Sequence, residues 1–121
     1  IDITAQTGIK SLDVTIDCDN LDAKELGTMG IPARFDLCNI EGFEDTNGTM
    51  HPAEDVREAI SALGFPIEDA VKDKPSIRLK IDKMFTGLLT GFPGNNNFIL
   101  TVTENNGLST TKTLKYYVPA N

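Results

Sequence analysis

The chain lacks the residues on which many functional sites depend. It has no tryptophan, one histidine and two cysteines among 121 residues, and aromatic side chains make up only 7% of it. Cys18 and Cys38 show no C-x-x-C spacing and are too few for a zinc site. No stretch approaches the roughly 20 apolar residues that cross a bilayer. The missing Cys…Trp…Cys pattern excludes an antibody-type core.

Motifs of common catalytic sites are absent as well. The sequence contains no G-x-S-x-G, no glycine-rich loop that would cradle a phosphate and no H-E-x-x-H. The single histidine, His51, stands beside Pro52 at the start of a predicted helix, which favours a surface or capping position. We therefore expect a protein that is not an enzyme and that carries no catalytic residues, metal or cofactor.

The net charge of the chain disfavours two classes of binding partner. Eighteen acidic residues against eleven Lys and Arg give a formal charge of −7, which repels phosphate backbones and anionic lipid. We expect neither nucleic-acid binding nor membrane insertion. The length predicts one domain, residues 1–121, and because the chain begins at Ile1 we expect it to be a piece of a longer protein.

The strongest structural pattern is a hairpin near the end of the chain. Phe98 to Glu104 and Leu108 to Val118 are rich in β-branched and aromatic residues, and an Asn-Asn-Gly sequence at 105–107 separates them. Asn and Gly tolerate the backbone angles of a tight turn, so this pattern predicts two antiparallel strands. Each strand has one apolar face that the rest of the chain must cover.

The other predicted strands alternate apolar and polar residues, which is typical of antiparallel sheets with one wet face. They are 2–7, 9–18, 34–39 and 76–82. The predicted helices are 21–26 with Asn20 as N-cap, 52–64 with an apolar stripe that packs on a sheet, and 83–90. The loops are 40–51, 66–74 and 92–97.

Together these elements predict a mainly β, immunoglobulin-like antiparallel β-sandwich with Greek-key connections and inserted short α-helices. Eight residues should fill the space between its layers. They are Leu12, Val14, Ile16, Ile77, Leu79, Ile81, Leu100 and Val102.

Three groups of residues leave a choice open. Cys18 and Cys38 either form a disulfide or remain as buried thiols. Asp17, Asp19, Asn20 and Asp22 offer oxygen ligands of the kind that calcium prefers, but they lack the glycine and the distal glutamate of an EF-hand loop. The polar loop from Glu41 to Gly48, with Phe43 among its acids, is either a solvated connector or a recognition surface. Tyr116 and Tyr117 point to opposite faces of their strand and make no joint platform for a sugar.

Several segments together resemble a known family. They are Ile-Lys-Ser-Leu-Asp-Val-Thr-Ile at 9–16, Leu-x-x-x-x-Leu at 21–26, Ile-Pro-x-x-Phe-Asp-Leu at 31–37, Ala-Leu-Gly-Phe-Pro at 62–66, Lys-x-x-Ile-x-x-x-Ile-Asp at 74–82 and Phe-Ile-Leu-Thr-Val-Thr-x-x-Asn-Gly at 98–107. This order resembles the immunoglobulin-like modules of surface lipoproteins from Bacteroides-type bacteria, which are often labelled cell-adhesion proteins. The resemblance implies export, a lipid anchor outside this chain and an extracellular place at the cell surface.

These observations lead to a functional expectation with one rival. We expect a non-catalytic cell-surface module that serves as an adhesion or spacer domain. Its partners would be neighbouring domains of the same chain and surface glycans or proteins of the host or of bacteria. The rival is a carbohydrate-binding accessory domain of a polysaccharide-utilisation protein. A third hypothesis is a calcium-dependent module.

Overall fold

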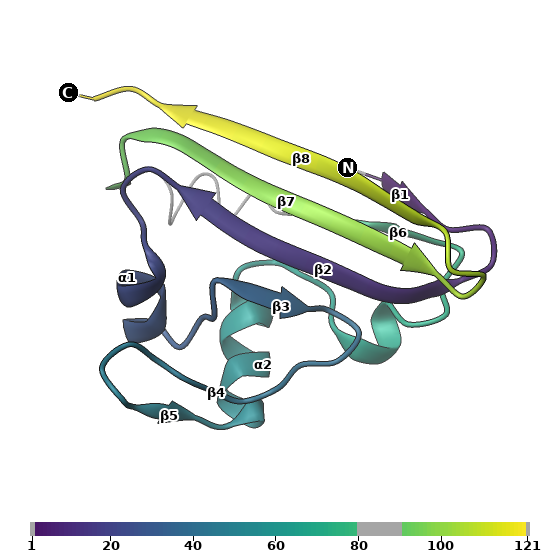
Figure 1. Ribbon diagram of the computed structural model, residues 1–121, viewed down its shortest axis with the longest axis horizontal. Coiled ribbons are helices and arrows are strands. Elements are labelled where there is room, and N and C mark those ends of the chain that lie inside the picture. Colours follow the sequence, from purple (N-terminus) through teal and green to yellow (C-terminus); the bar gives the residue numbers. More distant parts are fainter. Residues whose placement is uncertain (1, 80–90, 121) are drawn as a thin grey trace.

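The protein is mainly β, with antiparallel sheets and few helices (Figure 1). The computed structural model describes residues 2–79 and 91–120. Its elements are β1 (Asp2–Thr4), β2 (Ile9–Cys18), α1 (Ala23–Thr28), β3 (Arg34–Asp36), β4 (Phe43–Glu44), β5 (Met50–His51), α2 (Ala53–Ala62), a 3-10 helix η1 (Glu68–Ala70), β6 (Ser76–Arg78), β7 (Gly94–Glu104) and β8 (Ser109–Val118).

One four-stranded sheet forms the centre of the fold. Its strand order is β3-β2-β7-β8, and every neighbouring pair is antiparallel. β2 and β7 pair over nearly their full lengths although most of the chain separates them. The other strands of the described residues form two smaller sheets, β1-β6 and β4-β5. In Figure 1, α1, α2, β4 and β5 lie below the β3 side of the central sheet, and β8 forms its upper edge.

The predicted core combines the inner face of the central sheet with Ile77 of β6 and with Leu79, which follows that strand. Six of the eight expected core residues are buried: Leu12, Val14, Ile16, Leu79, Leu100 and Val102. Ile77 is half-buried against the same cluster, and Ile81 lies outside the described residues. Burial of these apolar side chains is the main force that holds the layers together. Val56 and Ile60 of α2 join the cluster, so the predicted packing of that helix on the core is confirmed.

The predicted C-terminal hairpin is confirmed. The Glu104 N–H donates to the Leu108 carbonyl at 2.8 Å, and the Gly107 N–H donates to the Glu104 carbonyl at 2.9 Å. Gly107 has φ +92°, a conformation that glycine adopts without a steric penalty. The turn therefore needs its glycine, as the Asn-Gly sequence indicated.

The predicted loop at 92–97 is wrong, because β7 already begins at Gly94. Three consecutive asparagines occupy this part of the strand, and a run of polar residues of this kind is typical of a loop. Asn96 and Asn97 pair with Cys18 and Asp17 of β2 on one side and with residues of β8 on the other. Pairing with a strand on each side satisfies the backbone and overrides a composition that is unfavourable for strands.

β3 ends at Asp36, three residues earlier than predicted. The Asp36 carboxylate accepts hydrogen bonds from the backbone N–H groups of Leu12 and Cys38, at 3.0 and 2.9 Å. A side chain that bonds to the backbone two residues further on makes a turn. This turn bends the chain away from β2.

The first helix also differs in detail from its prediction. α1 begins at Ala23, and Asp22 rather than Asn20 is its N-cap, with the Asp22 carboxylate accepting from the Glu25 N–H at 3.0 Å. The Asn20 side chain instead donates to the Pro93 carbonyl. α2 begins after Pro52, so the proline lies at the N-cap and not at the first helical position. The predicted helical segment at 83–90 and the end of the strand at 76–82 lie outside the described residues. No helix among residues 2–79 and 91–120 is long and apolar enough to cross a membrane.

Candidate functional site

Asp45 organises the segment that the sequence indicated as a loop. Its carboxylate oxygen Oδ1 accepts from the N–H groups of Asn47 and Thr49, at 2.9 and 3.0 Å. These bonds close a turn, and β4 and β5 pair on either side of it through Phe43 opposite His51 and Glu44 opposite Met50. The prediction of an unpaired loop over 40–51 is therefore wrong. The second half of this segment is a small hairpin held by one aspartate.

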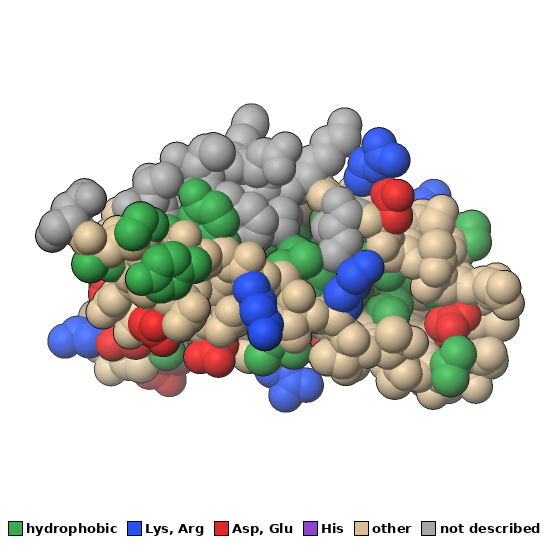
Figure 2. All heavy atoms as spheres, turned by 90° about the horizontal axis from the view of Figure 1, so that it is seen from above, with side chains coloured by type: hydrophobic (Ala, Val, Ile, Leu, Met, Phe, Trp, Pro, Cys, Tyr) green, Lys and Arg blue, Asp and Glu red, His purple; other side chains and the backbone are tan. Residues whose placement is uncertain are grey.

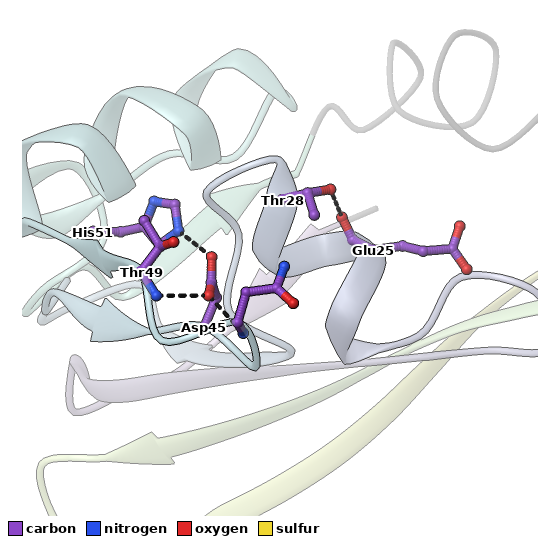
Figure 3. A network of polar contacts seen from close by, with 6 residues as sticks. Glu25, Thr28, Asp45, Thr49 and His51 are labelled. Carbon is purple, nitrogen blue, oxygen red and sulfur yellow. Dashed lines mark hydrogen bonds and ion pairs between the residues drawn. The ribbon is translucent and has the colours of Figure 1, made fainter.

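The other Asp45 oxygen fixes the histidine. His51 Nε2 donates to Asp45 Oδ2 at 2.9 Å, and Figure 3 shows the two side chains pointing toward one another. The rings of Phe43 and His51 stack, with 4.9 Å between their centroids and 18° between their planes. His51 thus has a structural role in the described part of the chain, because it joins the turn aspartate to the ring of Phe43.

Helix α1 packs against this hairpin at a glycine. A Cβ atom at Gly27 would lie 2.7 Å from the Cβ of Asp45, so no other residue fits there without movement. Figure 3 shows α1, with Glu25 and Thr28 on it, beside the turn. Thr28 Oγ1 donates to the Glu25 carbonyl at 2.7 Å near the end of the helix. The hairpin is therefore held in place by α1 as well as by its own bonds.

We expect Asp45→Asn to make the stability of the fold less dependent on pH in acid. The hydrogen bond from His51, and then that from the Thr49 N–H, lower the pKa of Asp45 below its ordinary value of 3.8. A lowered pKa in the folded state stabilises the fold above the ordinary value, and this stabilisation is lost as pH falls through the folded pKa. The variant should be less stable than the parent near neutral pH, and the difference should shrink below about pH 4.

Urea unfolding followed by circular dichroism at a series of pH values measures this difference. Asp69→Asn, at an exposed aspartate of η1, is the matched control and should show no such trend. A gap between parent and Asp45→Asn that stays constant from neutral pH to about pH 3 would contradict the role assigned to Asp45.

A groove of about 340 Å³ lies beside β3, and we call it the β3 groove. Its wall on the sheet side comes from β2 and β3, and its other wall comes from the segment that leads into β4. The lining residues are Asp13, Pro32, Arg34, Phe35, Asp36, Asn39, Glu41, Gly42 and Phe43. Gly42 allows a close approach here, because a Cβ at that position would lie 2.7 Å from the His51 carbonyl oxygen.

The polar groups of the β3 groove both donate and accept hydrogen bonds. Arg34 and Asn39 are exposed, and Asn39 Nδ2 donates to Glu41 Oε1 at 3.2 Å. The half-buried Asp13 lies directly opposite Asp36 in the pairing of β2 with β3. A guanidinium and an amide donate while carboxylates accept, which is the set needed to bind a ligand rich in hydroxyl groups. The half-buried Phe43 adds an apolar surface among them.

Sequence reasoning found only part of this groove. The predicted recognition loop from Glu41 to Gly48 contributes its first three residues, and the others build the hairpin behind them. The residues on the sheet side were missed. Arg34 and Asp36 do alternate with buried Phe35 on one strand, which indicated an outward polar face. Only the pairing of β3 with β2 shows that Asp13 lies on this face as well.

The four candidate calcium ligands lie at one junction, and three of them are used there by the protein itself. Asp19 Oδ2 accepts from the Asn95 N–H at 2.8 Å, Asp22 caps α1, and Asn20 bonds to Pro93. Asp17 is exposed on the outer face of β2. Within the described ranges no three His, Cys, Asp or Glu side chains gather to hold a metal ion. The junction therefore fixes the end of β2 to the start of β7 and to α1.

The remaining candidates also find structural places. Cys18 and Cys38 are both free thiols, and burial raises the pKa of each to about 11. Thiols with so high a pKa are poor nucleophiles near neutral pH. Tyr116 is half-buried and Tyr117 is exposed, so the two rings point to opposite faces as predicted.

Comparisons of the chain with protein-family models, with curated proteins and with solved structures found no match.

Proposed function

We propose that this chain is a non-catalytic adhesion module that contacts glycans through the β3 groove. One observation carries the proposal: a groove of about 340 Å³ at the β3 edge of the sheet combines Arg34, Asn39 and carboxylates with the half-buried side chain of Phe43. Sugars present hydroxyl groups that need both donors and acceptors, together with apolar C–H faces. A groove open to solvent suits the contact surface of an extended glycan better than a closed catalytic pocket.

The wider setting belongs to the same proposal. The chain would be an immunoglobulin-like β-sandwich with Greek-key connections, acting as one module in a lipid-anchored bacterial protein at the cell surface. The antiparallel sheets and the long-range pairing of β2 with β7 support this architecture. The formal charge of −7 argues against nucleic acid as the partner. A carbohydrate-binding accessory domain of a polysaccharide-utilisation protein would use the same groove.

We expect Phe43→Ala and Glu41→Ala to weaken glycan binding at least about tenfold, because each removes a wall of the groove. A glycan array screened with the parent chain identifies the ligand, and titration calorimetry then compares the variants. Met50→Ala is the matched control, since Met50 is 66% exposed on β5 and does not line the groove.

Two results would contradict this proposal. The first is that the parent binds nothing on the glycan array and nothing on a panel of extracellular-matrix proteins. That result would favour a spacer domain. The second is glycan binding that both groove variants leave unchanged. Calcium or a chelator at millimolar concentration, added to the same titrations, tests the hypothesis of a calcium-dependent module.

A further inference from the structure

Two Asn-Gly pairs lie at exposed turns, Asn47 with Gly48 between β4 and β5 and Asn106 with Gly107 between β7 and β8. In such a pair the side-chain amide of asparagine can react with the backbone, because glycine has no Cβ that would hinder attack by its nitrogen. Both glycines have positive φ, and both of their N–H groups donate to the carbonyl three residues earlier. A difference in reactivity between the two pairs therefore arises from what surrounds each of them.

The side chain of Asn106 is oriented by the backbone of its own turn. The Leu108 N–H donates to Asn106 Oδ1 at 3.0 Å, and the Asn106 N–H donates to Thr7 Oγ1 at 3.3 Å. When the Gly107 nitrogen adds to the side-chain carbon of Asn106, negative charge develops on this same Oδ1. A backbone N–H directed at that oxygen stabilises the charge, as in an oxyanion hole. Among the described residues, no donor bonds to Asn47 Oδ1.

The surroundings of the two glycines differ as well. No atom lies within 4 Å of a Cβ placed on Gly107, whereas Glu44 Oε1 lies 3.7 Å from a Cβ placed on Gly48. The attacking nitrogen must lose its proton, and a nearby carboxylate disfavours the negative charge that results. Figure 2 shows the end of the molecule with the β7–β8 turn at the right, covered mainly by atoms that are neither hydrophobic nor charged. Reaction is therefore favoured at Asn106 over Asn47.

We propose that Asn106 is a self-modification site, at which the chain converts this asparagine into aspartate or isoaspartate without an enzyme. The Gly107 nitrogen loses its proton to solvent and forms a bond to Asn106 Cγ. The bond from Cγ to Nδ2 then breaks, and the amide nitrogen takes a proton from water and leaves as ammonia. A water molecule opens the resulting cyclic imide at either of its carbonyls, which leaves aspartate or isoaspartate. No electrons are exchanged, and water is the only co-reactant.

The modification changes a turn at which distant segments meet. Asn105 Nδ2 donates to the Thr7 carbonyl and to the Asp73 carboxylate, and Glu104 Oε1 accepts from the Thr7 N–H at 3.1 Å. Both products add a negative charge near these two carboxylates. In isoaspartate the main chain also passes through the former side chain, so the bond from the Leu108 N–H to Oδ1 is lost. The modified turn should therefore hold the β1–β2 corner less firmly.

Peptide mapping by mass spectrometry, at intervals during incubation near neutral pH, measures the conversion at each asparagine. In the folded chain, conversion at Asn106 should be at least about tenfold faster than at Asn47. One oxyanion donor is worth about 10²–10³ in rate within an enzyme site, and water reduces this effect on an exposed turn. In concentrated urea the ratio of the two rates should fall toward one, because unfolding removes both sets of surroundings.

Matched variants separate the two sites. Asn106→Gln keeps the amide but requires a larger, less easily formed ring, so it should abolish isoaspartate at this turn. Asn47→Gln is the control and should leave the conversion rate at Asn106 unchanged. Hydrogen exchange gives a second readout at the Asn105 N–H, which donates to the Gly8 carbonyl at 3.0 Å. This amide should lose protection as the parent ages and keep it in Asn106→Gln.

Three outcomes would overturn the proposal. Equal rates at the two pairs in the folded chain would mean that their surroundings do not select Asn106. A preference for Asn106 that stays unchanged in urea would mean that the local sequence sets it. Conversion of Asn106 only in the unfolded chain would mean that the folded turn prevents the reaction.

Discussion

Leu100→Ala should lower the free energy of unfolding by about 2–5 kcal/mol, the range for removing a buried leucine from a packed core. Leu100 is 1% exposed and lies in the middle of β7. The residue paired with it on β2 is Val14, which is fully buried. The truncation would leave a cavity between the central sheet and the elements that cover it, because the strands on both sides of Leu100 restrict any collapse into the space.

Urea unfolding followed by far-ultraviolet circular dichroism measures this effect, since the chain has no tryptophan for fluorescence. Thr101→Ala is the matched control. Thr101 is the next residue of β7 on the opposite, outer face, where its hydroxyl bonds to that of Thr111 at 3.2 Å. The control should change the free energy of unfolding by about 1 kcal/mol or less, the range for a Thr–Thr pair across two strands. Equal losses in the two variants would mean that the faces of β7 are wrongly assigned.

The contrast between these two neighbours also explains what the sequence predicts well. Alternation along β2 and β7 specifies which face is buried, because a shift by one residue would expose every apolar side chain. β2 accordingly has the predicted bounds, Ile9 to Cys18. The hairpin turn was equally predictable from the sequence, because an Asn-Gly pair between two strand-like segments is a local signal for a tight turn.

The element boundaries failed where aspartate and asparagine side chains bond to the backbone. Asp36 ends β3, Asp22 caps α1 in place of Asn20, and Asp45 folds the predicted loop into a hairpin. Each of these residues has several polar neighbours of the same type. Asp22 and Asp45 bond to N–H groups within four residues, and the sequence does not say which of several similar neighbours makes such a local bond. Asp36 also accepts from the Leu12 N–H of β2, a contact that only the tertiary structure creates.

The β3 groove was only half predictable for a similar reason. Glu41 and Phe43 stood out as polar and aromatic residues in a turn-rich segment. Asp13 looked like any outward residue of a half-wet strand. It becomes part of the groove because β3 pairs with β2 in the register that places Asp36 opposite it. A site assembled from distant segments is visible only once that register is known.

Gly8→Ala should cost at least about 2 kcal/mol of stability, although it adds a single methyl group. Gly8 turns the chain between β1 and β2 with φ +93°, where a side chain is strained by about 1 kcal/mol or more. The new Cβ would also lie 2.7 Å from the side-chain nitrogen of Asn105 and 3.0 Å from the Asp73 carbonyl oxygen. Crowding of this kind in a packed site costs about 1–3 kcal/mol.

The second cost arises because three distant segments meet at Gly8. The Asn105 N–H donates to the Gly8 carbonyl at 3.0 Å, and the Asn105 side chain donates to the Thr7 carbonyl at 2.9 Å and to Asp73 at 3.1 Å. Gly107→Ala separates the two costs, since Gly107 has φ +92° but no atom within 4 Å of the added methyl group. Thermal and urea unfolding should show a clearly larger loss at Gly8. Equal losses would mean that backbone strain alone acts at both glycines and that the turn of the β7–β8 hairpin does not pack tightly against the β1–β2 corner.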